Sequence, residues 1–536
     1  MYNDLVNQTT DLSQLGTVLV DSLRRIEAYE AEILSRRQRD TIHVPTVGST
    51  LTTAYEQLRN ASEYAEDTLL QQRAIRRYLN RVLSFHTKVP TAKLGEELVT
   101  ELTQAEYLAN DHVTKADVKT LDSLIKQYYG AYWTYAGKEP NSSKRHNFQS
   151  WTLDTLAVKC EQTLKSHVRQ LMFAHFAQTY LQSKLTLKKL RRDNEKINDE
   201  DFPIVVYVAI HSALLKSDKM TIRSALMDSF RVDVTDNEAV VSFNERLDYL
   251  FGTKTVAYAT RIVGKNGAAL RFIYTGIFSD DAPITLQALR TPDTLEHALR
   301  SHIESEYVAL DKRLDKGILR SVVFLLITKS IIGIAIEIPY DILLYGSILW
   351  VPLVINLLFP SVFIAFSRLT LTIPNARNTN AVVGQVLGIL YQNEGAAPAV
   401  RIPKDSHSVG FNAAYALTFL LAFAGLSYVL HLLHFTIVQG MIFFVFLSTA
   451  SFLAFRLSRQ IHELEAVNAQ QSTLSVLRDV IYMPFIYVGQ QISYRYSQVN
   501  IVATVLDILI ELPLKTVLRL VRQWVQFLNA KKDELI

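Results

Sequence analysis

The sequence predicts a mainly α-helical protein, in which a soluble N-terminal helical domain precedes a helical membrane domain of about four spans. The distribution of charge supports this fold class. Nearly all long uncharged runs of the 536-residue chain follow Arg320, whereas residues 1–310 have the mixed charge of a soluble domain. Apolar residues recur at helical spacing in that first part, for example at Leu51, Tyr55 and Leu58.

The charge balance and the cysteine content exclude several classes of function. The net charge is only +4, from 56 Lys and Arg against 52 Asp and Glu, so nucleic acid is not expected as a bulk electrostatic partner. Cys160 is the only cysteine, which excludes an intramolecular disulfide and a Cys-based metal site within one chain. The first arginine is Arg24, and no basic stretch precedes an apolar run, so we expect no cleaved secretory signal.

Residues 1–230 are expected to form the soluble helical domain. Helical periodicity covers residues 51–85, 96–135 and 148–196, and the polar segment 137–146 is typical of a surface loop. Pro203 follows an acidic turn and begins another helix. The apolar run of that helix stops after about a dozen residues, short of the about 20 needed to cross a bilayer. We therefore expect a buried core helix there.

Residues 231–316 are expected to form a small α+β module with a connecting helix. Segments 255–263 and 269–275 are rich in β-branched and aromatic residues, and they flank the sequence Gly264, Lys265, Asn266, Gly267. Asn-Gly tolerates positive φ, so this pattern predicts a β-hairpin. A helix should follow over residues 292–314.

The same stretch, residues 262–273, resembles the GxxG loop of K-homology RNA-binding domains. In that family the loop joins two helices and clamps the nucleic-acid backbone. The resemblance implies RNA binding through Gly264 and Gly267. The hairpin interpretation is preferred, because the preceding segment is typical of a strand and only Arg261, Lys265 and Arg271 are basic.

Residues 317–460 are expected to form the membrane domain, with spans at about 321–338, 342–366, 411–430 and 435–455. Only Pro339, Tyr340 and Asp341 separate the first two apolar runs, and residues 431–434 separate the other two. At about 1.5 Å per residue the runs cover roughly 27–37 Å, enough for a hydrocarbon core of about 30 Å. Two helical hairpins follow from this spacing.

The positions of basic residues predict the orientation of the spans. They lie before the first span, between the hairpins and after the last span, and neither hairpin turn carries one. Because Lys and Arg favour the cytoplasmic side, both termini should be cytoplasmic, in a plasma membrane or a bacterial inner membrane. The residues concerned are Lys312, Arg313, Lys316, Arg320, Arg368, Arg377, Arg401, Lys404, Arg456 and Arg459.

Residues 461–536 are expected to form amphipathic interfacial helices. Lys515, Arg519 and Arg522 fall on one face of the last helix, opposite a face of Leu, Val and Trp. A basic stripe beside an apolar face suits an anionic leaflet, so the lipid headgroups are an expected partner. The alternative is that this helix docks onto the soluble domain of the same chain.

Lys329 and Glu337 are charged residues inside the first span. Lysine at mid-bilayer costs about 2.5–3.5 kcal/mol, so it should face protein or water. Eight residues correspond to about 12 Å along a helix, which predicts no direct ion pair. If the turn lies at residues 339–341, Lys329 is level with Trp350, and Tyr345 lies nearer the turn. With Asn356, these residues form the candidate intramembrane polar site, either an ion path or a packing contact.

The sequence predicts function only to the level of class. It contains no P-loop, HExxH, GxSxG or dinucleotide motif, so we expect no enzyme, no cofactor and no bound metal. The preferred hypothesis is a membrane-anchored scaffold whose cytoplasmic domain binds a protein partner, with homo-oligomer formation as a further expectation. The alternative is a transporter or channel component for ions or small solutes that uses Lys329 and Glu337. A membrane-tethered RNA binder is the third hypothesis.

Overall fold

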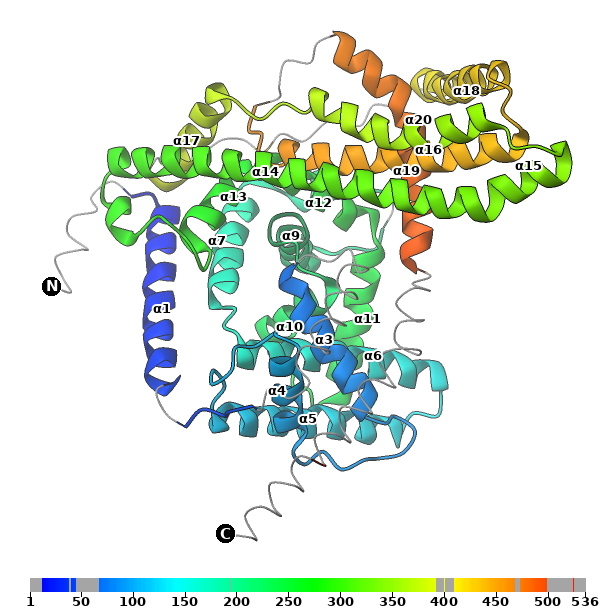
Figure 1. The fold of residues 1–536 in the computed structure, drawn as a ribbon. Helices are drawn as coiled ribbons and strands as arrows, with labels where there is room; N and C mark the ends of the chain where they lie inside the picture. The colour runs from blue at the N-terminus through cyan, green and yellow to red at the C-terminus, as the bar shows by residue number, and fades with distance from the viewer. Residues whose placement is uncertain are drawn as a thin grey trace, which may run out of the picture. The chain divides into compact units, whose positions relative to one another are not determined.

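The computed structural model describes residues 12–37, 40–44, 67–193, 195–391, 400, 409–467, 473–498 and 524. Within these residues all regular structure is helical, apart from one isolated bridge between Thr41 and Thr114 (Figure 1). The chain divides into two compact units. The N-terminal unit holds residues 15–263 and 278–280, and the C-terminal unit holds residues 264–277 and 281–499.

The N-terminal unit is a helical domain built around one apolar core. Leu79 of α3, Leu121 and Ile125 of α5, and Leu156 of α6 are fully buried in it. α5 begins at a capping box, in which the Thr114 side chain accepts from the Asp117 amide and Asp117 accepts from the Thr114 amide. The helices are α1 (Gln14–Arg37), α3 (Asp67–Val82), α4 (Leu94–Gln104), α5 (Lys115–Ala136), α6 (Ser142–Leu164), α7 (Val168–Lys184), α8 (Leu187–Leu190), α9 (Phe202–Ile210), α10 (Lys219–Ser229), α11 (Asn237–Gly252) and α12 (Lys254–Asn266), with turns η1 (Asp199–Asp201) and η2 (His211–Leu215).

The short apolar helix after Pro203 is a core helix, as the sequence predicts. α9 has nine residues, and its side chains Val205, Val206, Ala209 and Ile210 are fully buried. Pro203 stands in its first turn, where the missing N–H costs no helical hydrogen bond. The length limit therefore separates this helix correctly from the longer apolar ones.

The β-hairpin prediction is wrong. Residues 231–316, all of which the structure describes, contain no strand. Val256, Ala259, Ile262 and Val263 share a buried face of α12, so packing along that face overrides their β propensity. Gly267 has φ of −91°, so the positive φ on which the hairpin turn depended is absent there. It lies between α12 and α13 (Ala268–Ile273), which the π-turn η3 (Tyr274–Phe278) extends.

Among the described residues of the C-terminal unit, four helices are long and apolar enough to cross a membrane, in agreement with the four predicted spans: Pro292–Tyr345, Trp350–Thr370, Ala413–Leu432 and Ile437–His462. The first is a continuous helical run of 54 residues, so the predicted connecting helix and the first span are one element. Its parts are α14 (Pro292–Ile332), the π-turn η5 (Gly333–Glu337) and α15 (Ile338–Tyr345). The other elements of the unit are η4 (Leu286–Arg290), α16 (Trp350–Ser367), η6 (Arg368–Thr370), α17 (Ala376–Tyr391), α18 (Val409–Leu432), α19 (Ile437–His462) and α20 (Thr473–Gln498).

The first hairpin turn lies at residues 346–349, not at residues 339–341 as predicted. Pro339 is accommodated in the first turn of α15, directly after the π-turn η5, so the helix does not end there. Gly346 ends α15 with a left-handed φ of 70°, a conformation that glycine adopts without strain. The second turn, before α19, lies within two residues of its predicted position.

Side-chain hydrogen bonds connect the flanks of the apolar helices. Arg368, after α16, donates to Asp311 and to Asp315 (2.6 Å) of α14. Asn378 of α17 donates to the Tyr307 hydroxyl and to the Leu464 carbonyl, both at 2.8 Å. These contacts join the start of the first candidate span to the ends of the second and fourth. Arg401, Lys404, Lys515, Arg519 and Arg522 lie outside the described residues.

Candidate functional site

Many large apolar side chains of the apolar helices in the C-terminal unit are exposed, and several of their polar side chains are buried. Leu343, Ile334 and Ile437 are 84%, 68% and 81% exposed, and many similar side chains of these helices are also exposed. By contrast, several polar side chains of these helices are at most 2% exposed, and hydrogen bonds connect five of them. These are Lys329, Glu337, Asp341, Asn356 and Gln439, which we call the polar cluster.

Lys329 and Glu337 form an ion pair, so the prediction that they lie too far apart is wrong. The Lys329 ammonium group donates to Glu337 Oε1. In an uninterrupted α-helix, eight steps of about 100° place two side chains roughly 80° apart around the axis. The π-turn η5 holds one extra residue, so the rotation equals about seven α-helical steps, within roughly 20° of two full turns. Both side chains then share one face, and the Glu337 side chain tilts back toward Lys329.

An aromatic ring completes the surroundings of the lysine. The ammonium group of Lys329 lies 5.0 Å from the ring centroid of Phe446 in α19. A cation over an aromatic face gains about 2 kcal/mol when it is desolvated, as this one is. The lysine thus contacts a carboxylate of its own helical run and a ring of another helix.

Asn356 joins the ion pair to two further helices. Its amide nitrogen, on α16, donates to Glu337 Oε2 at 3.1 Å and to the backbone carbonyl of Gln439 in α19 at 3.2 Å. Three helical segments therefore meet at one side chain. Asn356 is one of the residues that the sequence analysis assigned to the candidate intramembrane polar site.

Asp341 and Gln439 belong to the cluster, and sequence reasoning missed both. Gln439 Nε2 lies 3.0 Å from each carboxylate oxygen of Asp341, and the Leu349 amide donates to Asp341 Oδ2 at 3.2 Å. Gln439 is held by a capping box with Thr436, whose amide donates to Gln439 Oε1 at 3.1 Å. Two signals in the sequence point to these residues: the spacing of Thr436 and Gln439, and Asp341 four residues after Glu337.

Tyr345 and Trp350 lie outside the cluster. They are 53% and 64% exposed at the two sides of the first turn. The reason is the position of the turn. With the turn at residues 346–349, Trp350 starts α16 beside the turn and does not lie opposite Lys329. Aromatic residues at the ends of apolar helices suit the membrane–water interface.

One oxygen of the cluster has no hydrogen-bond donor among the described residues. Asn356 Oδ1 is fully buried. The amide cannot be turned to exchange its oxygen and nitrogen, because the nitrogen already donates to Glu337 Oε2 and to the Gln439 carbonyl oxygen. An unsatisfied buried acceptor costs about 1–3 kcal/mol.

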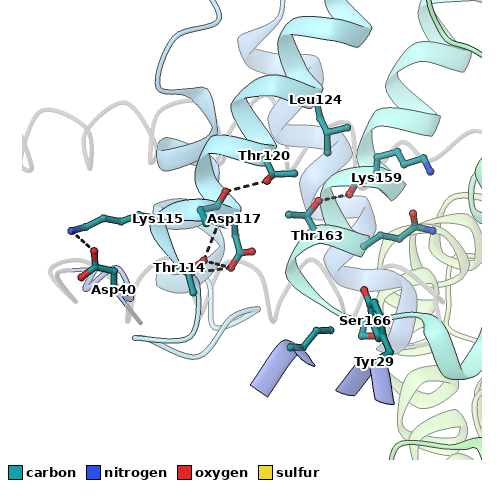
Figure 2. A pocket seen from close by; sticks show the side chains of 13 residues that line it. Tyr29, Asp40, Thr114, Lys115, Asp117, Thr120, Leu124, Lys159, Thr163 and Ser166 are labelled. Atoms are coloured by element: carbon teal, nitrogen blue, oxygen red, sulfur yellow. Dashed lines mark hydrogen bonds and ion pairs between the residues drawn. The ribbon is translucent and has the colours of Figure 1, made fainter. Parts of the chain in front are cut away.

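The N-terminal unit contains a separate cleft of about 860 Å³ between α1, α5 and α6, which we call the N-terminal cleft (Figure 2). Its wall mixes hydroxyl, charged and apolar side chains, and the two lysines are paired. Lys115 Nζ lies 3.7 Å from Asp40 Oδ2, and Lys159 Nζ lies 2.5 Å from Asp228 Oδ2. The lining residues are Tyr29, Ile33, Asp40, Thr114, Lys115, Ala116, Asp117, Thr120, Leu124, Lys159, Gln162, Thr163 and Ser166.

Gly264 belongs to the last turn of α12, and only Gly267 lies between α12 and α13. Arg271, the basic residue that follows, is only 7% exposed. Its guanidinium group donates to the Gly264 and Glu463 carbonyl oxygens. It is therefore committed to contacts within the chain.

Among the described residues, no three His, Cys, Asp or Glu side chains come together as a group of metal ligands. No protein-family model, no curated protein and no solved structure matches this chain.

Proposed function

We propose that this chain is a polytopic integral membrane protein whose four apolar helices anchor a helical N-terminal domain that binds a protein partner. The observation that carries the proposal is the arrangement of the C-terminal unit. Large apolar side chains such as Leu343 and Ile437 are exposed, while charged Lys329, Glu337 and Asp341 are buried. Water-soluble proteins expose charged residues, and a broad apolar surface marks contact with lipid or another protein.

The direction of insertion follows from the flanks. Arg313, Lys316 and Arg320 lie in the first of these helices before its apolar run, and Arg456 lies near the end of the fourth. The turns at residues 346–349 and 433–436 carry no Lys or Arg. The proposed orientation therefore places both ends of the four-span region in the cytoplasm and both turns outside.

Cysteine labelling tests this topology, because Cys160 is the only native cysteine. In a Cys160→Ala background, single cysteines replace Ser347 and Leu433 in the turns, and Ser305 and Gln460 in the flanks, all at exposed positions. A membrane-impermeant maleimide should label the two turn positions in intact cells, and the two flank positions only after permeabilisation. Labelling of all four positions in intact cells, or of none before permeabilisation, contradicts the proposed topology.

The bonding within the polar cluster supports a scaffold role. Its charged side chains contact partners from the same cluster, and the contacts join α14, α16 and α19. Buried polar contacts of this kind fix the packing of membrane helices. A protein whose spans mainly hold an N-terminal domain at the membrane requires such a fixed arrangement.

Transport is the second candidate function, because charged residues inside apolar helices also mark ion pathways. Lys329→Leu separates the two functions in proteoliposomes. Ser330→Leu is the control, since the Ser330 hydroxyl donates to the Leu326 carbonyl of its own helix. Lost ion flux with normal folded yield in Lys329→Leu, but not in Ser330→Leu, contradicts the scaffold role. Absence of flux in the unmodified protein contradicts transport through this site.

A further inference from the structure

The polar cluster has one more negative than positive group. Lys329 is its only cation, whereas Glu337 and Asp341 are both carboxylic acids. Glu337 is paired with the ammonium group of Lys329. Among the described residues, Asp341 receives hydrogen bonds only from neutral groups, the Gln439 amide and the Leu349 backbone N–H.

An unneutralised carboxylate is costly at this position. Asp341 is fully buried, and burying an unpaired ion in an apolar medium costs several kcal/mol. Glu337 lies one helical turn before Asp341 on the same side of the helix, so a second negative charge there would add repulsion. A single positive charge bound at the cluster removes both costs.

The cluster also lacks a donor. Asn356 Oδ1 is fully buried and has no hydrogen-bond partner among the described residues, although the nitrogen of the same amide bonds Glu337 and Gln439. An added proton supplies the one positive charge that balances the cluster.

We propose that the polar cluster is a binding site for one exchangeable proton, held on Asp341. Binding forms one O–H bond on the carboxylate and breaks none in the protein, and the proton comes from water. The backbone N–H of Leu349, in the first turn, donates to Asp341 Oδ2. The proton therefore exchanges with water on the side of that turn. The proposal rests on membrane insertion for the cost of the bare charge, and cysteine labelling tests insertion independently.

The other charged and titratable groups around Asp341 leave this assignment intact. On its own helical run they are Lys329 and Glu337, with Tyr340 and Tyr345 beside it in sequence. In the described residues of α16 there is no Asp, Glu, Lys, Arg or His. α19 contacts Asp341 through Gln439, and the preceding His431 and His434 are exposed.

Infrared spectroscopy of the full-length protein in liposomes tests the proposal. The parent carries Glu161→Gln, because the carboxyl of Glu161 in the N-terminal unit would contribute its own signal. The parent should show the carbonyl band of a protonated carboxylic acid at neutral pH, and Asp341→Asn should lack it. The substitution keeps an oxygen that accepts from Gln439 and Leu349, so the variant should fold.

Carboxyl-¹³C aspartate labelling gives a second measurement that needs no variant. The band should shift to lower frequency on labelling, and it should disappear as the pH is raised. A band that is unchanged in Asp341→Asn or insensitive to the label overturns the proposal. A second result would also overturn the proposal: the thermal midpoint of the parent rises with Na⁺ or K⁺ at fixed pH, whereas that of Asp341→Asn does not change. The site would then hold an alkali cation.

Discussion

Gly489 of α20 lies directly against the backbone of Ser448 in α19. A Cβ atom at Gly489 would fall 2.8 Å from the Cβ of Phe452, and closer still to the carbonyl oxygen of Ser448. Contacts this close between helices are made by small residues, and they are common among membrane helices. Phe485, on the same helix, packs on Phe423 and Phe444 with ring centroids 4.9 and 6.4 Å away. These contacts bind α20 to α18 and α19.

Gly489→Ala should therefore destabilise the C-terminal unit. The added methyl group meets backbone, which cannot move aside as a side chain can, and overpacking of this kind costs about 1–3 kcal/mol. Thermal unfolding in detergent, followed by size-exclusion chromatography, measures the loss. Gly440→Ala in α19 is the matched control, because a Cβ there meets nothing within 4 Å. Equal midpoints for the two variants would contradict the close approach of the helices.

The ion pair of Lys329 and Glu337 should stabilise the C-terminal unit mainly because each buried charge neutralises the other. Lys329→Met alone leaves the Glu337 carboxylate unpaired in the interior, so we expect a loss of about 3–5 kcal/mol. The double variant Lys329→Met with Glu337→Gln removes both charges and should recover most of that loss. A double-mutant cycle on folded yield and thermal midpoint measures the coupling. Additive effects of the two substitutions would show that the groups do not interact.

The stability of the N-terminal unit should depend on pH through Glu161. Burial, followed by the nearby charge of Asp218, raises the pKa of this carboxyl from 4.5 to about 8. The folded unit therefore keeps a proton that the unfolded chain loses above pH 4.5. The stabilisation that this proton provides is complete below that pH. As the pH rises further, the free energy of unfolding falls by up to about 1.4 kcal/mol per pH unit until the pH passes about 8.

Glu161→Gln should flatten this dependence, because the amide does not ionise and still accepts from Gln72. Thermal midpoints of the full chain between pH 5 and 8.5 measure the slope. Glu96→Gln, at an exposed position of α4, is the control and should keep the slope of the unmodified protein. An unchanged slope in Glu161→Gln would mean that another group is responsible.

The N-terminal cleft should be the contact site for the proposed partner. A photo-crosslinking amino acid at Thr120, which lines the cleft, should give a specific adduct in cells. The same amino acid at Gln127, on α5 but outside the cleft, should give none. Thr163→Trp narrows the cleft from α6 and should abolish the adduct from position 120. Identical adducts from positions 120 and 127 would place the partner elsewhere.

Several elements of the fold could be predicted because they depend on local composition. A run of about 20 apolar residues has one favourable environment, whatever it packs against, so the four candidate spans follow from the sequence. The length of α9 likewise identifies it as a core helix. The segment of α12 shows the limit of this reasoning. Its β-branched residues suggest a strand, and only packing along one buried face makes it a helix.

The sequence by itself determined that Lys329 needs a partner, because an unpaired ammonium group is costly among apolar helices. Tertiary structure decided which partner it has. One extra residue in the π-turn rotates Glu337 onto the same face, and the turn at residues 346–349 moves Trp350 away from it. Asp341 and Gln439 meet across helices 98 residues apart in the chain. Such contacts depend on the register between helices, which no local pattern of residues specifies.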